Sequence, residues 1–135
     1  MGKQSTYKPV KTSRRQVVRE ESTFFPVTEF FAGSGLVTEA LKDLFSVVWA
    51  NDICERKAKV YQANHGPNHF LTGPIQQVRG SELPEAVMSW ASFPCQDLSL
   101  AGNIVGIKST RSGLVWEWLR VLDECPVLPP VLVAE

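Results

Sequence analysis

Residues 91–99 read Ala-Ser-Phe-Pro-Cys-Gln-Asp-Leu-Ser and close an apolar run, 86–91, that is typical of a buried strand. Proline fixes its own backbone and pushes the residue before it toward extended geometry, so Pro94 ends this strand in a corner. The corner presents Cys95 at the carboxyl edge of the strand, where ligands bind in an open α/β sheet. Taken alone, a single cysteine is more often a small buried apolar side chain than a nucleophile.

Strand and helix patterns alternate along the rest of the chain. Strands are predicted over residues 24–31, 45–50, 69–72, 86–92 and from 131 onward. Apolar residues at helical spacing predict helices over 36–44, 55–64 and 112–124, whereas 75–84 is expected to be a loop or short turn. This alternation implies an α/β fold with a mostly parallel sheet and helices on its faces.

Charge is balanced overall but unevenly placed. The chain has 14 basic and 14 acidic residues, yet residues 1–25 hold six basic and only two acidic ones. We expect residues 1–23 to form a basic, disordered tail. Such a tail can bind nucleic-acid phosphates, although basic termini are more often simply solvated.

The number and spacing of the cysteines indicate whether the protein works in a reducing or an oxidising compartment. Cys54, Cys95 and Cys125 are odd in number and none form a close pair, which disfavours a disulfide framework or a zinc site. A metal site at His65 and His69 is also disfavoured, because Gly-Pro lies between them. There is no secretory signal and no run of ~20 apolar residues that would span a membrane. We therefore expect a cytoplasmic protein, or a nuclear one in a eukaryote, that is not secreted.

A glycine turn, Ala32-Gly33-Ser34-Gly35, follows the first predicted strand and precedes a helix. Strand, glycine turn and helix together can hold a cofactor, since glycine lets the backbone approach a ligand closely. The third glycine of the dinucleotide fingerprint is absent, so a purely structural turn is the alternative. Asp52 ends the second strand about 20 residues further on, which suits hydrogen bonding to ribose hydroxyls. Alternatively, Asp52 caps the helix that begins just after it.

Together these stretches resemble the cytosine-5 DNA methyltransferases. Phe-Pro-Cys-Gln-x-x-Ser-x-x-Gly, residues 93–102, resembles the nucleophile loop and is the most specific match. Four further stretches resemble motifs of the family. The cofactor loop is resembled by Phe30-Phe31-Ala32-Gly33-Ser34-Gly35, and the segment with the ribose-binding acid by Ala50-Asn51-Asp52-Ile53. The arginine turn is resembled by Thr110-Arg111-Ser112-Gly113-Leu114, and the start of the Glu-Asn-Val motif by Val133-Ala134-Glu135. The resemblance implies a partial Rossmann-like S-adenosylmethionine-dependent methyltransferase fold. Residues 24–135 would be the N-terminal portion of a catalytic domain, truncated within a buried fifth strand, with more of the fold following in a full enzyme.

The resemblance also implies roles for individual residues. Cys95 would attack carbon 6 of a cytosine flipped out of double-stranded DNA, with Glu135 at ring nitrogen 3 and Arg111 completing the catalytic set. Gln96 and Ser99 would contact DNA. The residues implied for S-adenosyl-L-methionine are Phe31, Ala32, Gly33, Ser34, Gly35, Asp52, Ile53, Pro94 and Leu114. Phe31 and Ile53 would sandwich the adenine; core packing is the alternative for these two and for Leu114.

The polar stretch 97–110 is expected to be a lid over the site. Ser99 and Lys108 are its candidate contacts, with plain solvent exposure as the alternative. Two positions depart from the family: Pro74 replaces an acid that contacts the adenine, and Asp97 replaces a proline or another small or apolar residue.

The implied function is DNA cytosine-5 methylation of the restriction-modification type, with S-adenosyl-L-methionine as the methyl donor. DNA and a complementing C-terminal chain are the expected partners, without a membrane or a metal. We expect the chain to be a fragment or one subunit of a split enzyme, inactive alone. The alternatives are a non-catalytic module that binds cofactor, nucleic acid or a partner chain, and RNA cytosine-5 methylation.

Overall fold

The computed structural model of the chain describes residues 24–94 and 113–135. Its elements, in order, are β1 (Phe25–Phe30), α1 (Leu36–Leu41), β2 (Phe45–Asp52), α2 (Glu55–His65), β3 (Phe70–Thr72), the 3-10 turns η1 (Ile75–Gln77) and η2 (Gly80–Glu82), β4 (Met88–Ala91), α3 (Gly113–Glu124) and β5 (Val131–Ala134). Each predicted strand and helix forms, with ends that differ by a few residues. The expected basic tail, residues 1–23, lies outside the described part. No helix of the described residues has both the length and the apolar character needed to cross a membrane.

The strands form one parallel sheet in the order β3-β2-β1-β4-β5. β1 lies at the centre, with β2 on one side and β4 on the other. The order of the strands along the chain therefore reverses direction between β1 and β4. In open α/β sheets, ligands bind in the crevice at such a switch point. The α/β, Rossmann-like expectation is confirmed.

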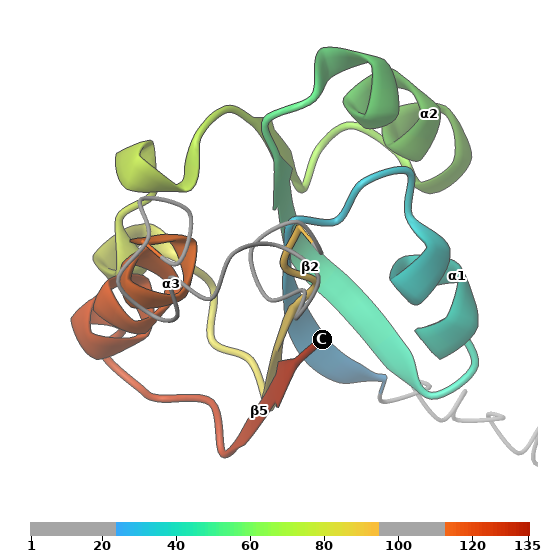
Figure 1. The fold of residues 1–135 in the computed structure, drawn as a ribbon. Helices are drawn as coiled ribbons and strands as arrows, with labels where there is room; N and C mark the ends of the chain where they lie inside the picture. Colours follow the sequence, from blue (N-terminus) through green and yellow to red (C-terminus); the bar gives the residue numbers. More distant parts are fainter. Residues whose placement is uncertain (1–23, 95–112) are drawn as a thin grey trace, which may run out of the picture.

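Helices cover both faces of the sheet, with α3 on one side and α1 and α2 on the other (Figure 1). On the α3 face, Phe30 of β1 packs in a buried cluster with Trp118 and Val121 of α3. On the opposite face, Tyr61 of α2 packs against Ala50 of β2 in a smaller cluster. β1 thus contributes to the larger core and also carries the loop at the switch point.

Apolar spacing predicts correctly where the helices form, but it does not predict how deeply their residues are buried. None of the residues of α1 is buried, and Leu36 is 79% exposed. Leu44, which the periodicity places in the same helix, lies after α1 and is also exposed. In α3 the buried positions are Trp118, Val121 and Leu122, because these face the sheet. Periodicity places a residue on a helix face, but the sheet determines how much of that face is covered.

β5 differs from the buried strand that we expected. Val131 is 48% exposed and Leu132 is 44% exposed. The reason is topological: within residues 24–94 and 113–135, β5 pairs with β4 alone and forms an edge of the sheet.

Candidate functional site

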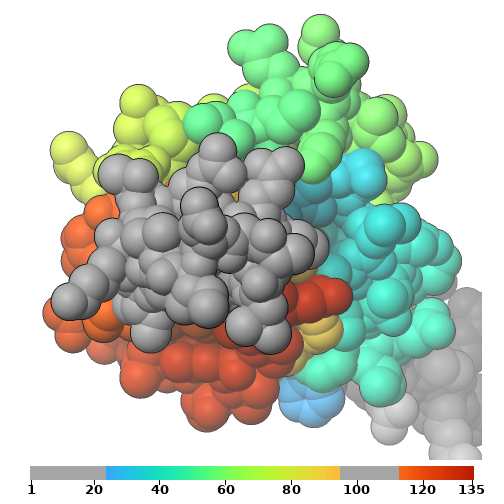
Figure 2. Space-filling view, in the orientation of Figure 1, coloured from blue at the N-terminus to red at the C-terminus, as the bar shows by residue number. Residues whose placement is uncertain are grey.

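The turn after β1, Ser92 and Phe93 after β4, and Glu135 after β5 meet at the carboxyl edge of the sheet. In Figure 2, red atoms of the C-terminal strand lie beside gold atoms of the β4 segment and cyan atoms of the α1 segment. A pocket of ≈ 360 Å³ opens here. Its lining comes from segments that are far apart in the sequence: Phe31, Ala32, Gly33, Ser34, Leu36, Val37, Lys57, Ser92, Phe93 and Glu135.

The turn after β1 has a backbone that few residue types adopt. Phe31, Gly33 and Gly35 have φ angles of +56°, +58° and +93°. For phenylalanine this left-handed conformation is strained, and such strain concentrates at functional sites. Gly35 is also crowded, because a Cβ there would lie 2.6 Å from Cδ2 of His65 and 3.0 Å from Cδ2 of Tyr61. The turn is therefore both strained and closely packed on the α2 side.

Asp52 fixes this turn to β2. Its Oδ2 accepts a hydrogen bond from the backbone N–H of Gly33 at 2.8 Å, and its Oδ1 accepts one from the N–H of Cys54 at 2.8 Å. The N-cap of α2 is Cys54, so Asp52 does not occupy the capping position that was its alternative role. Instead, its carboxylate joins the glycine turn to the start of α2.

Glu135 and the end of β4 are joined by main-chain hydrogen bonds. The Phe93 N–H donates to the Glu135 carbonyl at 2.9 Å, and the Glu135 N–H donates to the Ala91 carbonyl at 2.9 Å. The Glu135 side chain is exposed, and its Oε2 accepts a hydrogen bond from Ser92 Oγ at 3.3 Å. The Phe93 ring lies 5.1 Å from that of Phe31, centroid to centroid. Phe93, two residues before Cys95, is thus packed against the turn after β1.

The comparisons with known proteins identify the family. The family model for C-5 cytosine-specific DNA methylases matches residues 25–135. The chain belongs to this family. It is 32% identical to the type II methyltransferase M.NlaX of Neisseria lactamica, over 73% of this chain and 32% of that protein. It is also 32% identical to M.Eco47II of Escherichia coli, over 82% of this chain and 27% of that protein. The chain therefore spans about a third of the length of the curated relatives it matches.

Solved structures agree on the fold. The Dnmt2 methyltransferase of S. pombe superposes with a TM-score of 0.64 at 24% identity, over 82% of this chain and 35% of that one. A DNMT2 mutant of Spodoptera frugiperda gives a TM-score of 0.59 at 22% identity, covering 82% of this chain and 34% of that one. At these identities the likeness supports the fold alone.

The structure brings together much of the set that the family resemblance implies. Phe31, Ala32, Gly33, Ser34 and Glu135 line one pocket, and Asp52 is hydrogen-bonded to it through Gly33. Ile53 is 69% exposed, and Leu114 packs against the core around Trp118. Pro94 is exposed, and Pro74 precedes η1 in an extended conformation. The remaining expectations, for Cys95, Gln96, Asp97, Ser99, Lys108, Arg111 and the lid over 97–110, fall outside the described residues.

Three residues at or near the candidate site were missed by the sequence analysis. Lys57 and Ser92 line the pocket and carry no motif signal of their own. Glu29 is fully buried near the carboxyl end of β1, on the sheet face opposite α3. Burial raises the pKa of its carboxyl group to about 7; the Thr38 hydrogen bond opposes this rise, and the nearby Asp52 charge adds to it. The available signal was a charged residue inside an otherwise apolar strand.

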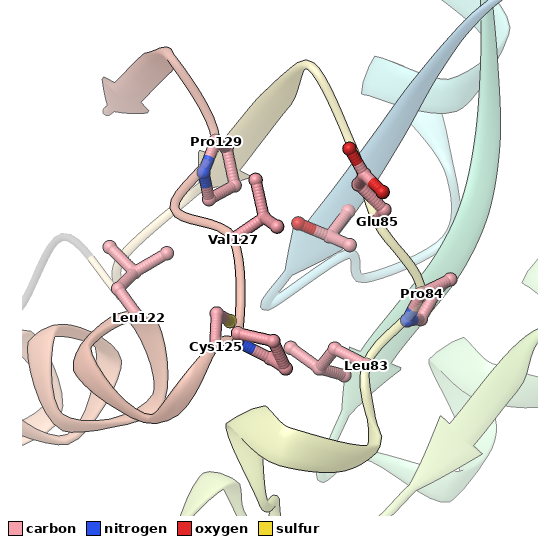
Figure 3. Close-up of a pocket in the computed structure, with 9 residues that line it drawn as sticks. Leu83, Pro84, Glu85, Leu122, Cys125, Val127 and Pro129 are labelled. Carbon is pink, nitrogen blue, oxygen red and sulfur yellow. The ribbon is translucent and has the colours of Figure 1, made fainter.

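A second pocket, of ≈ 210 Å³, lies between the segment before β4 and the segment after α3. Leu83, Pro84 and Glu85 come from the first segment, and Cys125 and Val127 come from the second (Figure 3). Burial raises the pKa of the Cys125 thiol, and the Glu124 charge adds to this rise. A thiol with a raised pKa is a poor nucleophile at neutral pH, so nothing connects this pocket to methylase chemistry.

Among residues 24–94 and 113–135, no three His, Cys, Asp or Glu side chains come together in a group that could hold a metal ion.

Proposed function

We propose that this chain is the cofactor-binding and nucleophile-bearing part of a DNA (cytosine-5)-methyltransferase. The observation that carries the proposal is the hydrogen bond between Asp52 and the Gly33 N–H at the switch point. It ties the glycine turn to an acid at the end of the next strand, which is the arrangement that binds a nucleoside. The family membership and the type II relatives support DNA as the substrate.

The residues present fit S-adenosyl-L-methionine. The pocket of ≈ 360 Å³ falls within the ~300–1,000 Å³ of small-molecule sites. Gly33 leaves room above the turn, since among the described residues a Cβ there would meet only Lys57 Cδ, at 3.9 Å. Each Asp52 oxygen accepts one backbone hydrogen bond, which leaves a lone pair on each for a ribose hydroxyl. The cofactor supplies a methyl group on a positively charged sulfur.

Cys95 and Glu135 carry the chemistry in this proposal. Carbon 5 of cytosine is too electron-poor to take a methyl group directly. The Cys95 thiolate adds to carbon 6 of the flipped base, and the displaced electron pair makes carbon 5 nucleophilic. Glu135 holds ring nitrogen 3, where charge develops. After methyl transfer, carbon 5 loses its proton to water, the ring double bond re-forms, and the carbon–sulfur bond breaks to release Cys95.

Calorimetric titration of the 135-residue chain with S-adenosyl-L-methionine tests the cofactor site. We expect saturable binding that Asp52→Ala weakens at least tenfold, because this substitution removes both the ribose acceptor and the support of the turn. The matched control is Asp43→Ala, an exposed aspartate between α1 and β2, which should bind as the parent does. The proposal would be overturned if the folded parent chain does not bind S-adenosyl-L-methionine, or if the Asp52→Ala variant binds it as tightly as the parent does.

We also propose that these 135 residues bind the cofactor without methylating DNA by themselves, because they span only about a third of the matched relatives. The check is an assay for 5-methylcytosine in duplex DNA with the purified chain alone. Formation of the product, abolished by Cys95→Ser, would contradict the inactivity while supporting the role of Cys95.

A further inference from the structure

α1 lacks the apolar anchoring that usually holds a helix to a sheet. None of its residues is buried, and Leu36 at its start is largely exposed. It begins directly after the glycine turn: the N–H of Glu39 donates to the Gly35 carbonyl at 2.9 Å. Whatever holds α1 in place therefore also holds one end of the turn that lines the pocket.

A chain of polar side chains runs from α1 into the core. Thr38 Oγ1 is hydrogen-bonded to Oε2 of the buried Glu29 and lies 2.8 Å from the hydroxyl of Tyr61. That hydroxyl lies 3.1 Å from Nε2 of His69. The chain joins β1, α1, α2 and the residue before β3. Thr38 is the α1 residue through which this helix is hydrogen-bonded to the sheet.

We propose that Glu29 is a positioning residue: its protonated carboxyl group, acting through Thr38, seats α1 and with it the glycine turn in the position that binds the cofactor. The consequence for the cofactor rests on the function proposed above. The seating of α1 is a property of the free chain and is measured independently.

The surroundings of Glu29 favour the neutral carboxyl group. Its Oε1 is buried without a hydrogen-bond partner in the described part of the chain, and an ionised oxygen in that position is strongly disfavoured. Burial raises its pKa to about 7, so both protonation states are accessible near neutral pH.

The titratable groups around it come from three elements. Asp52 from β2 adds a negative charge that disfavours ionisation of Glu29. Tyr61 from α2 stays protonated, because burial raises its pKa to about 12. Burial, with His65 nearby, lowers the pKa of His69, so at neutral pH His69 can accept a hydrogen bond through Nε2.

Thr38 Oγ1 donates to Oε2 of Glu29, and the Tyr61 hydroxyl proton can be donated to Thr38 or to Nε2 of the neutral His69. Ionisation of Glu29 keeps Thr38 as the donor but places a charge on the buried Oε1, which has no partner among the described residues. The cost of burying this charge exceeds the gain from the Thr38 bond, because the pKa of Glu29 is raised despite that bond. The relief available is for α1 to move away and admit water, which loosens the glycine turn. We therefore expect both α1 seating and cofactor affinity to fall as the pH rises through about 7.

Hydrogen exchange of the α1 amides in the free chain tests the seating directly. Protection factors, which correct for intrinsic exchange, are compared at pH 6 and pH 8.5. The parent should lose about tenfold protection across α1 at the higher pH, whereas Glu29→Gln, a neutral isostere, should keep it. Thr38→Val should have low protection factors across α1 at both pH values. Thr38→Ser, which retains the hydroxyl, should restore the protection profile of the parent.

The matched control is Glu39→Gln, an exposed carboxylate on the same helix that is paired with Lys42. It should follow the parent at both pH values. If Glu29→Gln loses protection as the parent does, or Thr38→Val keeps it, the inference is wrong.

Titration with S-adenosyl-L-methionine, using the same variants and pH values, separates the two proposals. Affinity that falls with pH in the parent but not in Glu29→Gln supports both. An α1 that loosens as expected in a chain that binds no cofactor at any pH refutes the proposed function and leaves Glu29 as the group that seats α1. Cofactor binding that neither Glu29→Gln nor Thr38→Val alters refutes the positioning role.

Discussion

Glu29 has a folded-state pKa of about 7 against an ordinary value of 4.5, because it is buried in β1. The folded chain therefore holds this proton more tightly than the unfolded chain does. The stability contribution is fully present below about pH 4.5 and is lost as the pH rises through about 7. At 1.36 kcal/mol for each pKa unit, the loss is at most about 3 kcal/mol in the free energy of unfolding.

Urea unfolding at pH 5 and pH 8 tests this sign. The parent should be less stable at pH 8 by up to about 3 kcal/mol through this group, and Glu29→Gln should lack that part of the loss. The difference between parent and variant isolates Glu29 from every other titratable group of the chain. Glu39→Gln is the control, because the exposed Glu39 has a pKa lowered by Lys42 and is ionised at both pH values. If Glu29→Gln shows the same pH dependence as the parent, Glu29 is not the titrating group.

Single residues also show what the sequence reveals about the site. Gly33, Gly35 and Asp52 were predictable, because each belongs to a local pattern with a physical reason. Glu29 and Tyr61 were not, since they meet only when the sheet order brings β1, α1 and α2 together. Their partnership depends on tertiary placement, which no local spacing records.

Among the elements, η2 and α3 make an unusually close contact. The Gly80 N–H donates to Glu124 Oε2 at 2.8 Å, and a Cβ on Gly80 would lie 1.9 Å from the Val121 carbonyl oxygen. Arg120 reinforces the contact by donating to the carbonyls of Ile75 and Val78, each at 3.2 Å. The two 3-10 turns are thus fixed to α3 by backbone and charged groups as well as by the apolar core.

Gly80→Ala should therefore destabilise the chain by about 3 kcal/mol, since backbone atoms rather than a flexible side chain must move. Gly113→Ala is the matched control: it lies at the start of α3, and no atom of residues 24–94 or 113–135 comes within 4 Å of its Cβ. The control should be neutral or stabilising by about 0.5 kcal/mol. Chemical unfolding of both variants gives the comparison. Equal stability of the two would mean that η2 shifts easily and does not fix α3.

Elements that are marked by a local sequence pattern were predicted, whereas features that depend on contacts with distant parts of the chain were not. β1 and β2 were predicted closely, because runs of aromatic and β-branched residues mark them. The exposure of α1 and β5 was not predicted. An apolar pattern shows that a face can be buried, whereas burial also requires a partner from elsewhere in the fold. The turns η1 and η2 carry a weak local signal and are held by α3, which lies about 40 residues further along the chain.

At the scale of the whole molecule, the two ends of the sheet are unlike. β3 is a short strand of three residues at one edge. The opposite edge is β5, which pairs with β4 alone within the described ranges and leaves its own outer main-chain groups unpaired by any strand there. Val131, Leu132 and the preceding Val127 and Leu128 are each exposed by 44–57%. An apolar edge strand of this kind is a template for pairing with another strand.

We expect the 135-residue chain to self-associate through this edge as its concentration rises. Leu132→Lys should weaken the association, because a charge on an edge strand opposes strand pairing, and it should change the free energy of unfolding by no more than about 0.5 kcal/mol at this exposed position. Sedimentation velocity over a range of concentrations measures the effect. Val60→Lys is the control, an exposed apolar residue on α2, which packs against β2 and β3 at the other side of the sheet. A chain that stays monomeric at every concentration, or one in which both substitutions weaken association equally, would show that β5 is not the contact.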